Sequence, residues 1–103
     1  MILLSSMVEV AAFLAENTRA MILCKTHSCK VCLSIEARLD KDKAIYEHWP
    51  IAYVYVDDLP MFRGEHSVFT VPTVLMFFEE KEIYRSSRFI DFNKMQYFVD
   101  AVG

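Results

Sequence analysis

Two cysteines separated by two residues, Cys29 and Cys32 in the stretch HSCKVCL, are the side chains of this 103-residue chain best suited to covalent chemistry. Such a pair can work as a redox couple, form a structural disulfide or supply half of a metal site. Cys24 and His27 precede the pair, so four side chains that could bind zinc or an iron–sulfur cluster fall within nine residues. The surrounding sequence must separate these alternatives.

The composition predicts one globular domain, residues 1–103, because about one hundred residues suffice for one hydrophobic core and are too few for two. Hydrophobic residues make up 54% of the chain, but charged residues interrupt the apolar runs well before the roughly 18 to 20 residues that cross a bilayer. The net charge is −3, and acidic and basic residues are interspersed without a basic stripe for phosphates. We therefore expect neither a membrane nor a nucleic acid as a partner.

The cysteine content and the N-terminal stretch favour a cytoplasmic location. Three cysteines are few and odd in number, unlike the even sets that cross-link small secreted proteins. The first residues have no basic segment before their apolar part and carry Glu9 and Glu16, which is not the pattern of a secretory signal. In a reducing compartment a CxxC pair is more often catalytic or metal-binding than structural.

Alternating strand and helix patterns predict an α/β fold. Apolar and β-branched runs predict strands at residues 2–4, 20–24, 51–56, 74–78 and 82–86. Apolar residues at helical spacing predict helices that begin at Ser6, span 30–48, fall within 57–67 as a short helix or loop, and span 92–102. Strand–helix alternation implies parallel strands, whereas the last two strands are close enough for an antiparallel hairpin. We expect a central mixed sheet with helices on both faces.

The helix over 30–48 is predicted from one apolar face, formed by Cys32, Ile35, Leu39 and Ile45. Pro50 should end this helix, because the residue before a proline is pushed out of the helical conformation.

The cysteine pair lies at the junction of the buried strand at 20–24 and this helix, which places Cys29 at the helix N-terminus. Free N–H groups and the helix dipole stabilise a thiolate there, and in such motifs the thiol pKa falls from about 8.5 toward roughly 3.5 to 7.5. Cys32, one turn later and facing inward, could then resolve a mixed disulfide. Lys30 and protonated His27 would add positive charge beside the Cys29 thiolate. Ligands on a buried strand and a helix start converge poorly, so we expect neither a metal nor a cofactor.

A second signal is Pro72 in the stretch VFTVPTV, directly before a strand that should be central. Proline is normally excluded from central strands. A cis Val71–Pro72 peptide bond would account for its presence there.

Together, SCKVC after a buried strand, TVPT before a later strand, the hairpin and the terminal helix resemble the thioredoxin family over essentially the whole chain. The resemblance implies a thioredoxin-like fold, with Cys29 as the exposed nucleophile and Cys32 as the resolving thiol. It also implies a cis-proline, Pro72, beside the sulfurs. The backbone of Val71, the residue before it, would bind an extended substrate peptide.

The chain departs from the family pattern in ways that predict a divergent member. The usual Trp-Cys-Gly-Pro-Cys is here Ser-Cys-Lys-Val-Cys. Leu23 and Tyr53 stand where the family has a buried aspartate and its lysine partner, and Arg88 aligns near a glycine that lines the substrate groove.

We predict a thiol–disulfide oxidoreductase, a protein disulfide reductase, that uses Cys29 and Cys32 in electron transport. Its partners would be disulfide-containing proteins or small-thiol substrates and an electron-donor reductase. The alternative is a noncatalytic binding module of thioredoxin fold, whose groove near Pro72 holds a partner while the cysteines stay idle.

Overall fold

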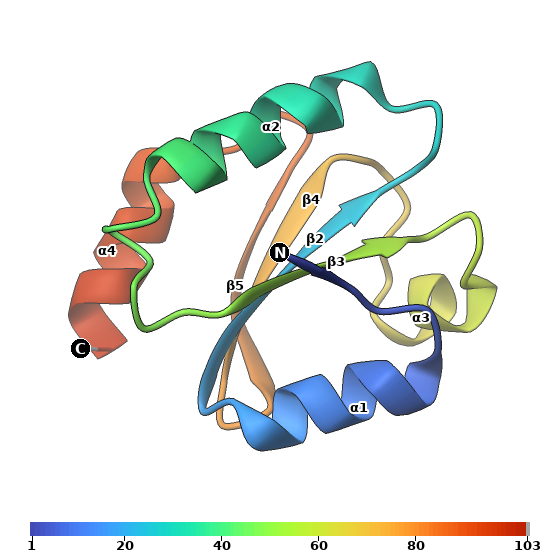
Figure 1. The fold of residues 1–103 in the computed structure, drawn as a ribbon, viewed down its shortest axis with the longest axis horizontal. Helices are drawn as coiled ribbons and strands as arrows, with labels where there is room; N and C mark the ends of the chain where they lie inside the picture. The colour runs from blue at the N-terminus through green and yellow to red at the C-terminus, as the bar shows by residue number, and fades with distance from the viewer. Residues whose placement is uncertain (103) are drawn as a thin grey trace.

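A computed structural model describes residues 1–102 and contains a five-stranded sheet with helices on both faces (Figure 1). The strands are β1 (Ile2–Leu3), β2 (Arg19–Lys25), β3 (Ile51–Tyr55), β4 (Thr73–Phe78) and β5 (Lys81–Ser87). The helices are α1 (Met7–Glu16), α2 (Lys30–Lys41), α3 (Pro60–Glu65) and α4 (Phe92–Val102). The predicted α/β fold with a mixed central sheet is confirmed.

Strand β2 occupies the centre of the sheet, whose strand order is β1-β3-β2-β4-β5. It pairs in parallel with β3 and antiparallel with β4, and β4 continues into the antiparallel β5. Residues 20–24 of β2 have no exposed surface. Their uninterrupted apolar sequence therefore matches a strand that is covered on both faces.

Two separate apolar cores hold the helices against the sheet. On one face, Val10 and Phe13 of α1 and Phe62 of α3 pack with Val54 of β3. On the other face, α2 and α4 pack against the sheet through a cluster that includes Leu39 and Met95 (Figure 1). The sheet thus anchors α2, whose first residue, Lys30, lies inside the cysteine motif.

The helix predicted over 30–48 is shorter, because α2 ends at Lys41 and residues 42–48 form successive turns. A helix of 19 residues would be about 28 Å long. After α2 the chain must reach the first residues of β2, because the Met21 N–H donates to the Pro50 carbonyl at 2.9 Å. A helix that continued to residue 48 would not leave the chain in that place. The turns also bury Tyr46, whereas Ile45, expected on the buried face, is 37% exposed.

The predicted hairpin is formed by β4 and β5, joined by a two-residue turn. Glu79 and Glu80 both have positive φ, 50° and 68°, as the central residues of a type I′ turn require. Glycine and asparagine usually fill such turns, so the sequence carried little sign of its geometry.

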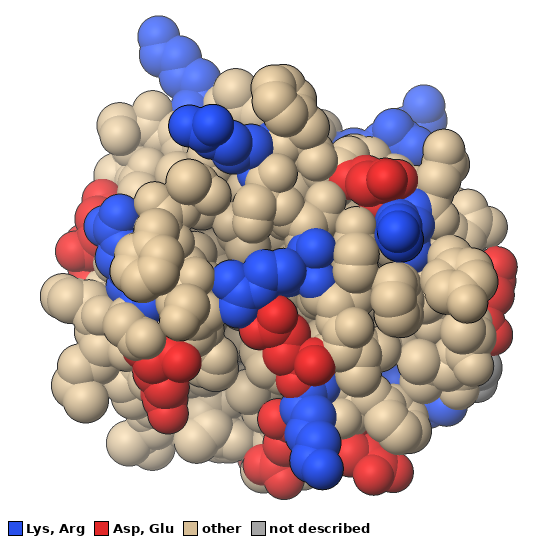
Figure 2. Space-filling model, turned by 180° about the vertical axis from the view of Figure 1, so that it is seen from behind, with Lys and Arg blue, Asp and Glu red and all other residues tan. Residues whose placement is uncertain are grey.

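The surface has mixed charge and the helices are short. Figure 2 shows basic and acidic side chains interspersed on one face of the molecule, without separation into two patches. Among residues 1–102, no helix combines the length and the apolar character needed to cross a bilayer.

Candidate redox site

Cys29 and Cys32 are joined by a disulfide at the start of α2, with their Cα atoms 5.4 Å apart. Cys29 is the N-cap residue of the helix, and its N–H donates to the Thr26 carbonyl at 3.2 Å. Cys32, in the first turn, is 1% exposed, whereas Cys29 is half-buried. Cys29 is therefore the residue of the pair that a partner can reach.

The start of α2 is electrostatically suited to a thiolate. No side chain caps the helix N-terminus, and the first turn contains no acidic residue. The free N–H groups and the positive end of the helix dipole are therefore available to a sulfur anion on Cys29 after reduction. Lys30, exposed at the first helical position, adds a positive charge next to it in the sequence.

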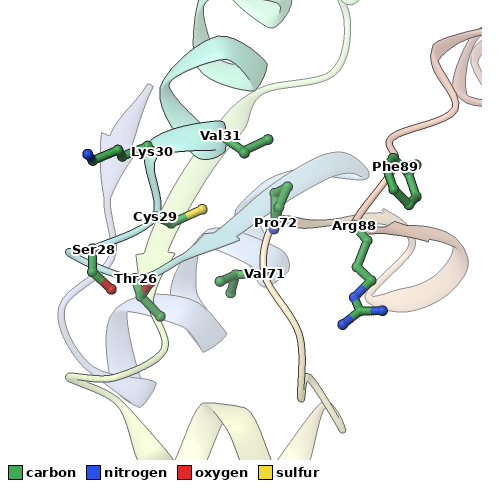
Figure 3. A pocket seen from close by; sticks show the side chains of 9 residues that line it. All are labelled: Thr26, Ser28, Cys29, Lys30, Val31, Val71, Pro72, Arg88 and Phe89. Atoms are coloured by element: carbon green, nitrogen blue, oxygen red, sulfur yellow. The ribbon is translucent and has the colours of Figure 1, made fainter.

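A surface groove of about 460 Å³ brings Cys29 together with the segment before β4 (Figure 3). The Val71–Pro72 peptide bond is cis, and both residues line this groove. The sulfur of Cys29 points toward Pro72 in the close-up. The full lining consists of Thr26, Ser28, Cys29, Lys30, Val31, Val71, Pro72, Arg88 and Phe89.

Hydrogen bonds fix the Pro72 segment against the end of the hairpin. The Arg88 N–H donates to the Pro72 carbonyl at 2.7 Å, and the Thr73 hydroxyl donates to the Thr70 carbonyl at 2.7 Å. Arg88 has a φ of 64°, a left-handed conformation that glycine adopts more easily than arginine. The residues that follow β5 are therefore part of the groove wall.

Comparison with known proteins supports the family resemblance. No family model matches the chain. It is 27% identical over 96 residues to the thioredoxin-like protein YdfQ of Bacillus subtilis (strain 168), an alignment that covers 90% of this chain and 83% of that protein.

Solved structures agree with the fold over almost the whole chain. Thioredoxin of Plasmodium falciparum superimposes with a TM-score of 0.86 at 13% identity and covers 100% of both chains. Thioredoxin of Fasciola hepatica gives 0.85 at 19% identity, with 98% of each chain covered. Mitochondrial thioredoxin 3 of Saccharomyces cerevisiae in its oxidised form gives 0.84 at 17% identity and covers 98% of this chain and 94% of that one.

The protein has a thioredoxin fold. The prediction of a divergent thioredoxin-like protein is therefore confirmed for the fold. A cysteine pair at disulfide distance in this fold supports thiol–disulfide oxidoreductase chemistry in general terms.

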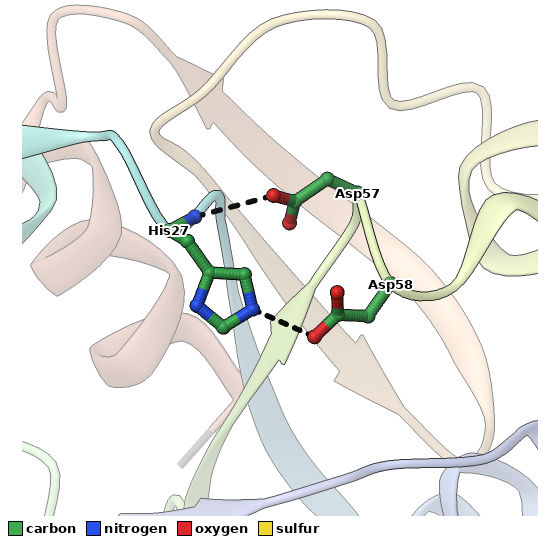
Figure 4. Close-up of side chains that lie close together, drawn as sticks. All are labelled: His27, Asp57 and Asp58. Carbon is green, nitrogen blue, oxygen red and sulfur yellow. Dashed lines mark hydrogen bonds and ion pairs between the residues drawn. The ribbon is translucent and has the colours of Figure 1, made fainter.

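In this thioredoxin-like protein, His27 contacts carboxylates that follow β3 (Figure 4). Its Nε2 lies 2.7 Å from Asp58 Oδ2, and its backbone N–H donates to Asp57 Oδ2 at 3.4 Å. The imidazole also stacks on Tyr55, with ring centroids 3.8 Å apart. The hydrogen bond to Asp58 raises the pKa of His27, but the same carboxylate offsets the charge that the imidazolium would present to Cys29.

A buried ion pair near the motif was missed by the sequence reasoning. Lys25, the last residue of β2, is only 7% exposed, forms an ion pair with Glu36 of α2 and lies 4.1 Å from the Tyr53 ring centroid. Burial opposes its charge, but the contact with Glu36 outweighs burial and raises the pKa of Lys25. Leu23, where the family has a buried aspartate, is fully buried. The visible signal was Glu36, one helical turn after Cys32.

Lys25 and His27 line a second pocket, of about 280 Å³, which also contains Cys29, Cys32 and Tyr55 of β3. We call it the β3 pocket. The groove extends to the other side of β2, toward β4 and β5, because β2 separates β3 from β4 in the sheet. The two cavities share Thr26, Ser28, Cys29 and Lys30.

The structure does not assemble the four side chains weighed as metal ligands. Cys24 lies in the apolar core, where burial raises the pKa of its thiol to about 12. His27 is exposed beside Asp58, and the sulfurs of Cys29 and Cys32 are bonded to each other.

Proposed function

We propose that this protein is a thiol–disulfide oxidoreductase that reduces disulfides of proteins or small thiols through Cys29 and Cys32. One observation carries the proposal: the half-buried Cys29 sits at the start of α2, disulfide-bonded to the buried Cys32, in the groove that Pro72 lines. Val71, beside Pro72, would supply backbone groups to an extended substrate segment.

The reaction would proceed in two exchanges. In the reduced protein, the Cys29 thiolate attacks one sulfur of the substrate disulfide, and the other substrate sulfur leaves as a thiolate. Cys32 then loses its proton, attacks the Cys29 sulfur and releases the second substrate thiolate. The substrate has gained two electrons, and the Cys29–Cys32 disulfide has formed. An electron-donor reductase would return two electrons to this disulfide and complete the cycle.

The charged groups around the sulfurs would stabilise the Cys29 thiolate to different extents. Lys30 would favour the Cys29 thiolate, since it is exposed and adjacent to that residue. His27 would contribute less, because its charge is offset by Asp58. A reducing compartment, which the cysteine content favours and which the cytoplasm provides, would make reduction the working direction.

A second candidate is a noncatalytic binding module that holds a partner in the groove. The departures from the family favour it: Leu23 and Tyr53 stand where the family has a buried Asp–Lys pair, and Arg88 lies near the position of a groove glycine. Cys29→Ser separates the two functions, because it removes the nucleophile and leaves the groove in place.

The experiment compares wild type, Cys29→Ser and the control Cys24→Ser in the reduction of a fluorogenic peptide disulfide by dithiothreitol. The proposal expects wild type and Cys24→Ser to accelerate the reduction and Cys29→Ser to be inactive. Equal rates for all three proteins would overturn the enzymatic proposal. Partner capture that persists in Cys29→Ser would then favour the binding module.

A further inference from the structure

Arg88 and Phe89, directly after β5, line the groove and have no part in the exchange chemistry. Both are exposed, and Phe89, at 91%, is the most exposed large hydrophobic side chain within residues 1–102. In Figure 3 the Arg88 guanidinium extends on the same side as Val71, while the Phe89 ring projects separately. They therefore present a cation and an apolar surface beside the segment that would hold a substrate.

The charges of the groove have one sign. Its charged lining residues are Lys30 and Arg88, and no aspartate or glutamate lines it. Within residues 1–102, neither cation forms an ion pair with a carboxylate. The nearby Asp58 is bound to His27 on the side of the β3 pocket. A carboxylate from a partner would therefore meet no acidic competitor in the groove.

The backbone gives Arg88 a fixed direction. Its N–H donates to the Pro72 carbonyl at 2.7 Å, which ties the start of its side chain to the segment opposite Cys29. With a φ of 64°, this position would accept glycine more easily than arginine. The local conformation thus does not account for the arginine, whereas a role for its guanidinium would.

We propose that the groove binds an extended protein segment with an acidic side chain within two residues of its disulfide cysteine, and that Arg88 binds this carboxylate. The inference rests on the proposed reductase function and names its substrate class. A substrate strand advances about 3.3 Å per residue, so an arginine side chain near Val71 can reach residues adjacent to the reacting cysteine. Val31, which is 56% exposed, and Phe89 would contact apolar side chains of the same segment.

The test uses peptide disulfides that are identical except for Glu, Gln or Lys, placed in turn one or two residues to either side of the cysteine. Wild type should reduce the best-placed Glu peptide with a kcat/KM about three- to tenfold above that of its Gln counterpart, and the Lys peptide should be the poorest. The preference should weaken as salt is raised from 20 to 500 mM (roughly a fivefold fall in Debye length).

Arg88→Glu should reverse the order of the three peptides. Lys81→Glu makes the same change of charge at the opposite end of β5 and should keep the wild-type order. Arg88→Gly, which suits the backbone conformation, should abolish the preference without reversing it, and it serves if Arg88→Glu folds poorly.

The outcomes distinguish this inference from the proposed function. Equal reduction of all three peptides by wild type, or a Glu preference that persists in Arg88→Glu and Arg88→Gly, would overturn the inference and leave the reductase function standing. Failure of wild type to reduce any of the peptides would overturn both.

Discussion

The basic side chains on the two sides of the start of α2 differ in whether they are paired with carboxylates. In the β3 pocket, the Lys25 ammonium contacts Glu36 and the His27 imidazole contacts Asp58. In the groove, Arg88 has no carboxylate beside it in the lining, and Lys30, which lines both cavities, forms no ion pair within residues 1–102. Paired charges have little interaction energy left for a partner, whereas unpaired exposed cations keep theirs. From this contrast we expect the β3 pocket to stabilise the motif and, under the proposed function, the groove to receive the substrate.

The largest effect is expected when the cysteine pair itself is changed. Cys32→Ala removes the resolving thiol, so turnover should fall by roughly two orders of magnitude or more. A mixed disulfide between Cys29 and the substrate should accumulate, and intact-protein mass spectrometry would detect it. The double variant with Cys29→Ser is the control and should form no adduct. An undiminished rate in Cys32→Ala would show that resolution does not depend on this thiol.

The next effect concerns the stability of the β3 pocket. Glu36→Gln would leave the Lys25 ammonium buried without its carboxylate, which should lower the free energy of unfolding by about 2–4 kcal/mol in urea titrations of the oxidised protein. The double variant Lys25→Met/Glu36→Gln should recover most of this loss, because an apolar side chain tolerates burial. The matched control, Glu47→Gln, changes a side chain that is 75% exposed and should cost less than about 0.5 kcal/mol.

The same ion pair has a defined pH dependence. Because the folded-state pKa of Lys25 is raised, its stabilisation is complete below the ordinary lysine value of 10.5 and is lost as the pH rises through the folded-state pKa. Unfolding titrations at increasing alkaline pH should therefore show the difference in the free energy of unfolding between wild type and Glu36→Gln shrinking. A constant difference would contradict the assignment.

A smaller effect is expected on the groove side. Arg88→Gly should raise the free energy of unfolding by about 0.5–1 kcal/mol, because glycine adopts a φ of 64° without the steric cost that arginine bears. Arg63→Gly, inside α3, serves as the control and should lower it by about 1 kcal/mol. A loss of stability in Arg88→Gly would mean that the arginine side chain contributes to folding and not only to binding.

The smallest effect concerns His27. Asp58→Asn removes the hydrogen-bonded carboxylate, so the pKa of His27 should fall toward its ordinary value of about 6.5, as followed by NMR of the ring protons. With the folded-state pKa raised, any stabilisation from His27 is present below pH 6.5 and lost as the pH rises through the folded-state value. Glu47→Asn, remote from His27, should leave the titration unchanged. An unchanged titration in Asp58→Asn would show that this carboxylate does not raise the pKa of His27.

Local patterns were enough to predict the order of elements. The β2 run has apolar residues on both faces, and the hairpin strands lie close together in the sequence, so each could be recognised within a short window. The end of α2 could not, because it depends on the distance back to Met21 and on the burial of Tyr46. These are tertiary constraints that override helical periodicity.

The site shows the same division. The placement of Cys29 at a helix start follows from the strand and helix on either side of it. The ion pairs of Lys25 and His27 join residues 11 and 31 positions apart, and no periodic pattern signals them. Burial of a lysine is also uncommon, so the presence of Glu36 alone did not indicate that Lys25 is buried and paired. The family resemblance placed Arg88 near the groove, but only the structure shows its backbone conformation.

The depth of Cys24 has a practical consequence for thiol counting. With no exposed surface and a pKa of about 12, its sulfur should not react with alkylating reagents at neutral pH while the protein is folded. A native stoichiometry assay on the reduced chain should therefore return fewer equivalents than the three cysteines present, and the full number should appear only in denaturant. The missing equivalent would report on global opening of the sheet rather than on the redox state of the neighbouring pair.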